Sequence, residues 1–222
     1  AGDGAVMATA EATLSSFDHE NAFYLSAQPI KVLAQYELFK MALDVPGAIV
    51  ECGVFKGASF VRLAMLRELL GNAFAKPLIG FDTFTTYATN AYMPRDSELR
   101  QNVVRDAGDK CIGVDELMGV LRLKGCDKNA ILIPGDVVET LPQYLAARPE
   151  LRISFVNLDL DFYAGSVVAL RELWPRMATG GVFMLDDYGV FAGETAAIEE
   201  VLQGVRIRKF PFCYSPAYVV KE

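Results

Sequence analysis

The sequence predicts an α/β protein built on one mostly parallel β-sheet, with an antiparallel hairpin near the end of the chain. Short apolar runs bounded by turn residues alternate with segments of helical periodicity, which is the pattern of βαβ units. The runs are continuous rather than alternating with polar residues, as is typical of parallel strands that helices cover on both faces. The length of 222 residues suits a single domain, 1–222, because a domain has about 150 residues.

Five buried strands are expected, and each ends at a glycine, a proline or an acidic residue. They span 48–52, 77–82, 130–133, 153–158 and 181–185. Helices are expected between them, at 58–70, 114–123, 138–147 and 166–177. Two further strands flank a proline-bounded turn and would pair as an antiparallel hairpin, which makes seven strands. These last strands span 205–210 and 217–220.

Two segments lie outside this alternation. Residues 1–44 form an N-terminal helical extension, with a helix expected over 28–43. Residues 83–111 form the one long irregular stretch, which contains Tyr87 and Tyr92. A loop of that length in a compact domain is commonly a lid or a substrate-binding loop, and the alternative is a surface insertion without function.

The composition excludes several classes of protein. Hydrophobic residues make up 52% and charged residues 22% of the chain, so disorder and coiled coil are excluded. The net charge is −7, and the only basic cluster, 206–209, has the pattern of the polar face of a strand. We therefore expect no nucleic-acid partner. No apolar run approaches the roughly 18 residues of a membrane span, so no membrane partner is expected.

The cysteines indicate a reducing compartment. None of the four has a partner at Cys-x-x-Cys spacing, and the lone His19 cannot complete a zinc site. Reduced thiols and the lack of signal-peptide order in 1–10 favour a cytoplasmic protein. The apolar N-terminal helix and the closing hairpin offer surfaces for self-association, so we expect a homo-oligomer.

The residues that follow each strand are the candidate site, because ligands of parallel α/β sheets bind at the carboxyl ends of the strands. The first strand contains Glu51 and leads into Gly53 and Gly57, a turn that lets backbone approach a ligand closely. The spacing is not that of the dinucleotide fingerprint. An acidic first position suits a ligand with an ammonium group better than a pyrophosphate.

Two further strand ends carry single carboxylates. Asp82 can accept hydrogen bonds from both hydroxyls of a ribose, or it can cap a turn. Asp136 can accept a hydrogen bond from an adenine amino group, or it can cap the helix that starts near Val138. The residues alone leave both alternatives open at both positions.

Four carboxylates crowd the ends of the fourth and fifth strands: Asp159, Asp161, Asp186 and Asp187. Adjacent strands lie about 4.7–4.9 Å apart, so these charges would repel one another unless a cation neutralises them. Oxygen ligands without His or Cys suit a hard divalent ion, Mg²⁺ first, and we expect Asp159, Asp186 and Asp187 to bind it. The alternative is a set of solvated strand-end acids.

The order of these motifs resembles the macrocin O-methyltransferase family, and most closely its deoxyhexose 3-O-methyltransferase branch. The segments that carry the resemblance are IVECGVFKG at 49–57, GFDTF at 80–84, LDLDFY at 158–163, LWP at 173–175 and GGVFMLDDYG at 180–189. The resemblance spans residues 28–220. It implies a Rossmann-like class I methyltransferase fold and an enzyme that uses S-adenosylmethionine and Mg²⁺ to methylate a sugar hydroxyl. The sequence departs from the family at Leu160, where many relatives carry glycine, and in the Thr/Tyr-rich segment 85–92; both departures concern the acceptor.

The resemblance also implies roles for single residues. The cofactor-binding residues that it implies are Glu51, Gly53, Gly57, Ser59, Asp82 and Asp136. Asp82 would then hold the ribose of S-adenosylmethionine, and Asp136 would lie near its adenine. The acceptor would be a small-molecule sugar or a glycosylated natural product.

The reaction needs a base, because a sugar hydroxyl is a poor nucleophile near neutral pH. Asp161 is the candidate general base and Asp159 is its rival, since the motifs contain no histidine. The aromatic residues Tyr87, Tyr92 and 23–24 are candidates for stacking on the acceptor. Two other functions remain open: a catechol-type O-methyltransferase, and a nucleoside-binding domain without catalysis.

Overall fold

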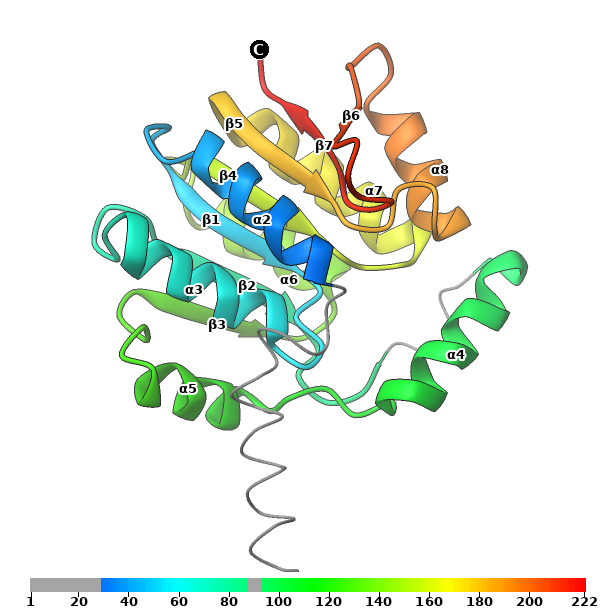
Figure 1. Cartoon of the computed structure of the whole chain (residues 1–222), viewed down its shortest axis with the longest axis horizontal. Helices are drawn as coiled ribbons and strands as arrows, with labels where there is room; N and C mark the ends of the chain where they lie inside the picture. The colour runs from blue at the N-terminus through cyan, green and yellow to red at the C-terminus, as the bar shows by residue number, and fades with distance from the viewer. Residues whose placement is uncertain (1–28, 88–92) are drawn as a thin grey trace, which may run out of the picture.

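One seven-stranded sheet forms the centre of the computed structural model, which describes residues 29–87 and 93–222 (Figure 1). The strand order is β3-β2-β1-β4-β5-β7-β6. The five parallel strands are β1 (Ala48–Cys52), β2 (Leu78–Asp82), β3 (Ala130–Pro134), β4 (Ile153–Leu158) and β5 (Met177–Leu185). The short strands β6 (Arg208–Lys209) and β7 (Ala217–Val220) pair antiparallel, and β7 also runs antiparallel to β5. The expected mostly parallel sheet with its closing hairpin is confirmed.

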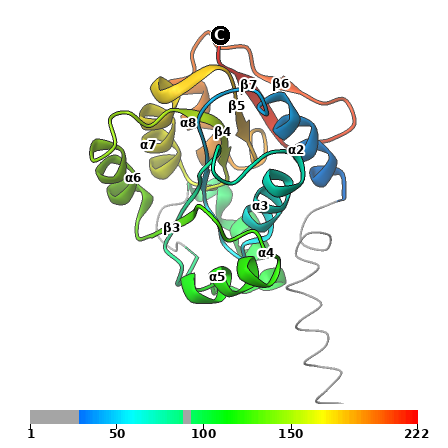
Figure 2. The ribbon, with the colours of Figure 1, turned by 90° about the vertical axis from the view of Figure 1, so that its left-hand side faces the viewer.

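Helices cover both faces of the sheet (Figures 1 and 2). The helices on one face are α2 (Pro29–Met41), α3 (Ala58–Leu70) and α5 (Val114–Leu123). Those on the other face are α6 (Val137–Ala146), α7 (Tyr163–Leu173) and α8 (Ala192–Val201). This three-layer arrangement is the one that continuous apolar strands require, because both faces of each strand must be buried.

Successive strand residues point into two separate cores. Ile49 of β1 and Phe155 of β4 pack with α2 and α3, whereas their neighbours Val50 and Val156 pack with α6 and α7. All four side chains are at most 1% exposed. Since side chains alternate across a strand, a run of mostly apolar residues fills both cores at once. The central strands are therefore packed on both faces, and their carboxyl ends provide a well-packed framework for a site.

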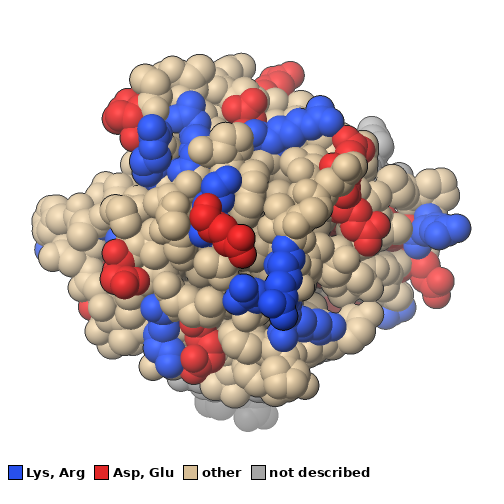
Figure 3. Space-filling model, turned by 90° about the horizontal axis from the view of Figure 1, so that it is seen from above, with Lys and Arg blue, Asp and Glu red and all other residues tan. Residues whose placement is uncertain are grey.

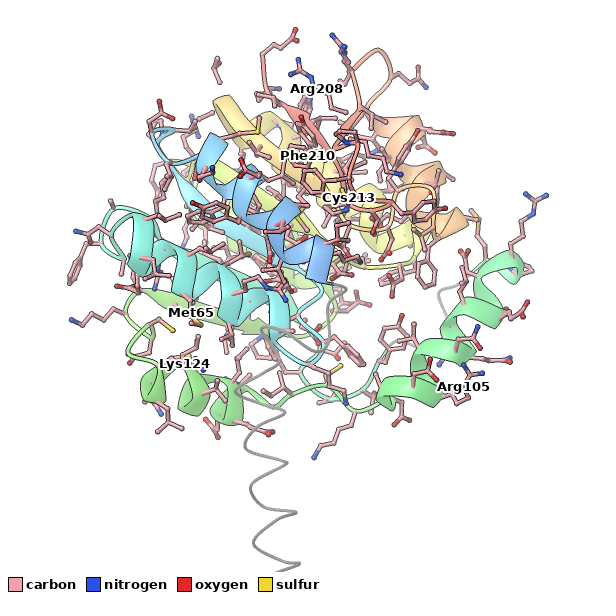
Figure 4. All side chains as sticks on the ribbon, viewed as in Figure 1. Met65, Arg105, Lys124, Arg208, Phe210 and Cys213 are labelled. Atoms are coloured by element: carbon pink, nitrogen blue, oxygen red, sulfur yellow. The ribbon has the colours of Figure 1, made fainter. Side chains whose placement is uncertain are left out.

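The structure corrects the expected irregular stretch at 83–111. It contains a 3₁₀ turn, Pro94–Asp96, and the helix α4 (Ser97–Ala107). No residue of α4 is buried, and most of its eleven residues are polar, so the segment lacks the apolar content of a packed helix. In Figure 1, α4 stands apart from the layers, beyond the edge to which the parallel strands point. Arg105, labelled in Figure 4, is an exposed residue of this helix.

Two backbone hydrogen bonds join the two ends of the segment 83–111. The amide of Tyr87 donates to the carbonyl of Asp109 over 2.6 Å, and the amide of Cys111 donates to the carbonyl of Thr85 over 3.0 Å. The two ends of the segment therefore pair with each other, and α4 lies beyond that pairing. Residues 1–28, with the candidates at 23–24, and Tyr92 lie outside the described residues.

Other boundaries differ for identifiable reasons. The helix expected at 166–177 is α7, which begins three residues earlier and ends four residues earlier. A 3₁₀ turn follows at Trp174–Arg176, where Pro175 cannot donate an amide hydrogen. The sequence reading missed α8 altogether. Its buried residues include Gly193 and Glu194, so no long apolar stripe marks it.

The surface shows charges of both signs. On the face seen in Figure 3, Lys and Arg lie in small groups among Asp and Glu. Arg206 and Arg208 are exposed while Ile207 between them is half-buried, which agrees with the expected polar face of a strand. Cys213 and Phe210 lie in the segment that joins β6 to β7 (Figure 4), and the four cysteines are buried and free. Among the described residues, no helix combines the length and the apolar character needed to cross a bilayer.

Candidate functional site

The site lies where the strand order reverses, between β1 and β4. The chain leaves β1 toward β2 and β3 and returns to β4 on the opposite side of β1, so the loops after β1 and β4 meet at one edge. Gly53 follows β1 with φ of +91°, and a Cβ there would come within 1.7 Å of the carbonyl oxygen of Asp159. Only glycine allows these two loops to touch.

A cavity of about 140 Å³ opens at the carboxyl ends of β1 to β4. Four of the predicted site residues line it: Gly53, Asp82, Asp136 and Asp159. Apolar side chains complete the wall, including Phe81, Val137 and Phe162. The glycine turn and the strand-end acids are thus brought together as the sequence predicts.

Asp82 holds the glycine turn in place. Its Oδ2 accepts hydrogen bonds from the amides of Val54 at 2.8 Å and Phe55 at 2.9 Å, and its Oδ1 accepts one from the amide of Phe84 at 2.8 Å. Phe55 and Phe84 have φ of 48° and 55°, a conformation that bulky residues rarely adopt. The turn-capping alternative is therefore present, and the ribose contact stays a prediction.

Asp136 caps α6. Its Oδ1 accepts a hydrogen bond from the amide of Val138 at 2.9 Å, which is the capping alternative. Asp136 also lines the cavity of about 140 Å³, and its contact with adenine stays a prediction.

Glu51 lies beneath the glycine turn, fully buried on β1. Its Oε1 accepts hydrogen bonds from the hydroxyl of Ser59 and, at 3.0 Å, from the side-chain Nδ2 of Asn157, while its Oε2 has no partner in the described part of the chain. Burial raises the pKa of Glu51 to about 8, against these hydrogen bonds and the charge of Arg62. Gly57 caps α3 in a left-handed conformation. Glu51 supports the turn from below, and its contact with a cofactor stays a prediction.

A second, larger cavity of about 1030 Å³ lies on the other side of the acids. Leu99 and Val103 of α4 line one part of it, and Asp159, Asp186 and Asp187 line another. Asp159 lines both cavities. Asp159 therefore stands at the junction of a small cavity and a large one, whereas Asp186 and Asp187 line only the large one and Asp161 lines neither.

Three carboxylates lie close together beside this junction. Asp159, Asp161 and Asp187 each offer an oxygen, and these oxygens lie within 4.8 Å of one another. Burial raises the pKa of all three, and the neighbouring negative charges raise it further. Such a set fits a hard divalent cation, whose charge would offset the repulsion. That they bind Mg²⁺ stays a prediction.

Asp186, the third expected ligand, is placed differently. Its Oδ2 accepts a hydrogen bond from the ammonium of Lys31 on α2 at 2.7 Å. Burial opposes the charge on Lys31, but Asp186, Asp187 and Asp159 outweigh it and raise the Lys31 pKa. Lys31 is separated from Asp186 by 155 positions, so no motif reveals the pairing. It supplies one positive charge to the acid cluster.

Glu194 is the functional residue that sequence reasoning missed. It is fully buried in the first turn of α8. Its Oε2 accepts hydrogen bonds from the amides of Leu160 and Asp161 at 3.2 Å, and its Oε1 accepts one from the amide of Asp187 at 3.1 Å. Burial and the charge of Asp187 raise the pKa of Glu194. One side chain thus ties together the loops that follow β4 and β5.

Asp161, the candidate base, has an unusual environment. Its φ is +65°, a left-handed conformation that Asp tolerates better than most residues, and Glu194 holds its amide. The hydroxyl of Tyr87 donates a hydrogen bond to its Oδ2. Tyr87 also lines the smaller cavity, and its ring centroid lies 5.3 Å from that of Phe55. The predicted stacking residue therefore contacts the predicted base.

Comparisons with known proteins agree with this geometry. The macrocin O-methyltransferase (TylF) family model matches residues 35–209. The 8-demethyl-8-(2,3-dimethoxy-alpha-L-rhamnosyl)-tetracenomycin-C 4'-O-methyltransferase of Streptomyces olivaceus is 26% identical over 155 residues, which are 68% of this chain and 57% of that protein. Mycinamicin III 3''-O-methyltransferase of Micromonospora griseorubida is 24% identical over 158 residues, 70% of this chain and 60% of that protein. The chain spans less than two thirds of the length of these relatives.

Solved structures agree with the fold. The crystal structure of CalS11, a calicheamicin methyltransferase, superimposes with a TM-score of 0.72 at 28% identity, over 85% of this chain and 77% of that one. The O-methyltransferase NovP superimposes with a TM-score of 0.70 at 16% identity, over 87% of this chain and 80% of that one. These likenesses confirm the Rossmann-like class I methyltransferase fold. With a family match that covers most of its length, the chain belongs to the macrocin O-methyltransferase family.

Proposed function

We propose that this chain is an S-adenosylmethionine-dependent and Mg²⁺-dependent O-methyltransferase that acts on a hydroxyl of a deoxysugar. One observation carries the proposal: Asp159 lines both cavities, so a methyl donor in the smaller one and an acceptor in the larger one would meet at the acids. Family membership supports the reaction class. The related proteins act on a rhamnosyl tetracenomycin and on mycinamicin III, which supports a glycosylated natural product or a nucleotide sugar as acceptor.

The residues of the smaller cavity fit an adenosyl cofactor. Gly53 keeps the turn free of side chain, which lets backbone amides approach a ligand. Phe81 and Phe162 offer apolar surface for a flat base, and Asp136 offers an acceptor for an amino group. When bound there, S-adenosylmethionine supplies the methyl group for transfer.

The acid cluster fits Mg²⁺ because its donors are all carboxylate oxygens and their charges are crowded. Asp159 and Asp187 would hold the ion, with Asp186 as the third predicted ligand and Asp161 close by. When bound, the ion lowers the pKa of an acceptor hydroxyl and fixes its orientation.

The chain's own residues supply the base and its orientation. Asp161 would take the proton of the acceptor hydroxyl at its carboxylate, with Asp159 as the rival candidate. The hydroxyl of Tyr87 and the carboxylate of Glu194 hold the side chain and the amide of Asp161, respectively. Lys31 holds Asp186 toward α2. This prior positioning would supply much of the acceleration.

A methyl-transfer screen with isotope-labelled S-adenosylmethionine tests the proposal. We expect transfer to nucleotide deoxysugars or glycosylated natural products, and loss of transfer in chelator. Asp161→Asn should abolish most of the transfer, while Asp115→Asn, an exposed acid on α5, should leave it unchanged. Transfer to catechols alone would contradict the sugar acceptor. Binding of S-adenosylhomocysteine without transfer to any acceptor would favour a nucleoside-binding domain.

We also propose that the chain forms a homo-oligomer. Phe212 and Tyr214 in the closing hairpin are 41% and 68% exposed, and such apolar surface is commonly covered by a partner. Light scattering at micromolar concentration should give a multiple of the monomer mass. The variant with Phe212→Ser and Tyr214→Ser should shift toward the monomer. A monomer for the unmodified chain would contradict this proposal.

A further inference from the structure

Asp96 is the buried anchor of the segment that contains α4. Among the residues of the turn Pro94–Asp96 and of α4, it is the only buried one, at 1% exposure. Its Oδ1 accepts a hydrogen bond from the amide of Ala192 at 2.7 Å, and its Oδ2 accepts one from the amide of Gly193 at 2.9 Å. Both donors belong to the start of α8, almost a hundred positions along the chain.

The start of α8 has no cap of its own. The first amides of a helix lack partners within the helix, and the side chain of the N-cap residue, Phe191, makes no capping hydrogen bond. Asp96 supplies both the hydrogen bonds and the negative charge that this end of a helix favours. Gly193 makes the approach possible, because a Cβ there would lie 3.2 Å from the Asp96 carboxylate and 2.9 Å from the amide nitrogen of Tyr163.

The same turn of α8 carries Glu194, which holds the amides of Leu160, Asp161 and Asp187. The first turn of α8 therefore has two attachments. On one side, Asp96 fastens it to the segment that bears α4. On the other side, Glu194 fastens it to the backbone of the acid cluster. A change in either attachment reaches the other through one helical turn.

We propose that Asp96 is a positioning residue that couples the placement of α4 to the geometry of the acid cluster. This inference rests on the proposed function. α4 forms one wall of the larger cavity and the acids form another, so a single carboxylate fixes both walls around the acceptor. Asp96 itself does not line either cavity. Its effect on the reaction is transmitted through α8.

Hydrogen exchange tests the coupling without any acceptor. In Asp96→Asn, which keeps one acceptor oxygen, and in Asp96→Ala, we expect faster exchange in two places: the amides of α4, and those of Leu160, Asp161 and Asp187. The amides of β1 and β2 should exchange as in the unmodified chain. The control is Glu98→Gln, an exposed acid in the first turn of α4, which should change neither set. Faster exchange confined to α4 would overturn the coupling.

Kinetics separate positioning from folding. Rates are expressed per S-adenosylhomocysteine-binding site, measured by calorimetry, so that unfolded molecules do not count. In Asp96→Asn we expect the acceptor KM to rise and kcat to fall, with kcat/KM at least about tenfold lower, as for a lost charge-assisted hydrogen bond. Affinity for S-adenosylhomocysteine should stay within about twofold.

The outcomes distinguish the two proposals. A kcat/KM within twofold of the unmodified chain, or a loss of S-adenosylhomocysteine binding in both variants, would overturn the role of Asp96. If the unmodified chain methylates no sugar, the proposed function fails. The hydrogen-exchange result still decides whether Asp96 couples α4 to the acids.

Discussion

The strand ends of β1 to β3 and those of β4 and β5 carry similar numbers of carboxylates, but the surroundings of these carboxylates differ. On the first side, the chain's own donors hold the acids. Asp82 accepts hydrogen bonds from three backbone amides and Asp136 caps α6, whereas Glu51 accepts hydrogen bonds at Oε1 only. On the second side, Asp159, Asp161 and Asp187 face one another, and burial with mutual repulsion raises their pKa values.

This difference indicates which half of the site is complete without a ligand. Three backbone amides donate to Asp82, so the chain's own hydrogen bonds hold the turn around the smaller cavity. The acid cluster instead carries crowded charge, with Lys31 as one cation beside it. We infer that the strand ends of β1 to β3 are preorganised for a ligand. The acid cluster after β4 and β5 would become competent for catalysis only when a cation offsets the repulsion.

The largest effect is expected for Asp159→Asn. This change keeps the shape of the side chain but removes a charge from the junction of the cavities, so methyl transfer should fall by orders of magnitude. The free energy of unfolding without metal should hold or rise, since repulsion falls. Turnover and Mg²⁺ titration measure both effects, with Asp115→Asn as the matched exposed control. Normal turnover in Asp159→Asn, or full activity in chelator, would show that the cluster is not a catalytic metal site.

A smaller effect, on cofactor affinity rather than on turnover, is expected for Asp82→Ala. The amides of Val54, Phe55 and Phe84 lose their acceptor, so the left-handed conformations of the two phenylalanines lose support. Affinity for S-adenosylhomocysteine should weaken by about 1.5–3 kcal/mol, as for a lost charge-assisted hydrogen bond. Calorimetry measures this, and Mg²⁺ binding serves as the internal control because it should not change. Unaltered affinity would show that the turn does not need Asp82.

Glu194→Gln tests whether one side chain holds both loops of the acid cluster. An amide group cannot accept at both ends, so at least one of the three backbone amides loses its partner inside the protein. The free energy of unfolding should fall by about 1–3 kcal/mol, the cost of a buried unsatisfied group. Urea unfolding measures it against Glu199→Gln, an exposed acid on the same helix, for which a change within about 0.5 kcal/mol is expected. Equal values for the two variants would contradict the role of Glu194.

The last prediction is a pH dependence of the free energy of unfolding at Glu51. Its pKa is about 8 in the folded chain, and an unfolded Glu has about 4.3. The folded state therefore holds an extra proton between these values, and stability falls as pH rises through that window, by at most about 1.4 kcal/mol per pH unit.

Glu51→Gln should remove the part of the slope that Glu51 contributes, while the acids around Asp187, whose pKa values are also raised, keep theirs. Urea unfolding between pH 5 and pH 8 measures it, and Glu150→Gln, an exposed acid, should keep the slope of the unmodified chain. A slope that is the same with and without Glu51 would show that the carboxyl is ionised in the folded state.

Much of this molecule can be predicted from its sequence because local patterns encode it. Every residue of the runs Ala48–Cys52 and Ile153–Leu158 is buried, and most are apolar. The exceptions are the buried polar residues Glu51, Ser154 and Asn157. The strand-end acids follow those runs directly, so the site's position follows from the parallel arrangement. The helix α4 escaped prediction because it buries nothing, and α8 because its buried side chains include a glycine and an acid.

The sequence by itself determined the layers, the carboxyl edge and the acids that stand there, because burial imposes a periodicity that can be read along the chain. Only the tertiary structure decided how those acids are used. Lys31 draws Asp186 toward α2, Asp161 joins Asp159 and Asp187, and Asp96 and Glu194 meet at one turn of α8. These contacts join residues far apart in the chain, and a hydrogen bond between distant segments leaves no periodic trace in either one.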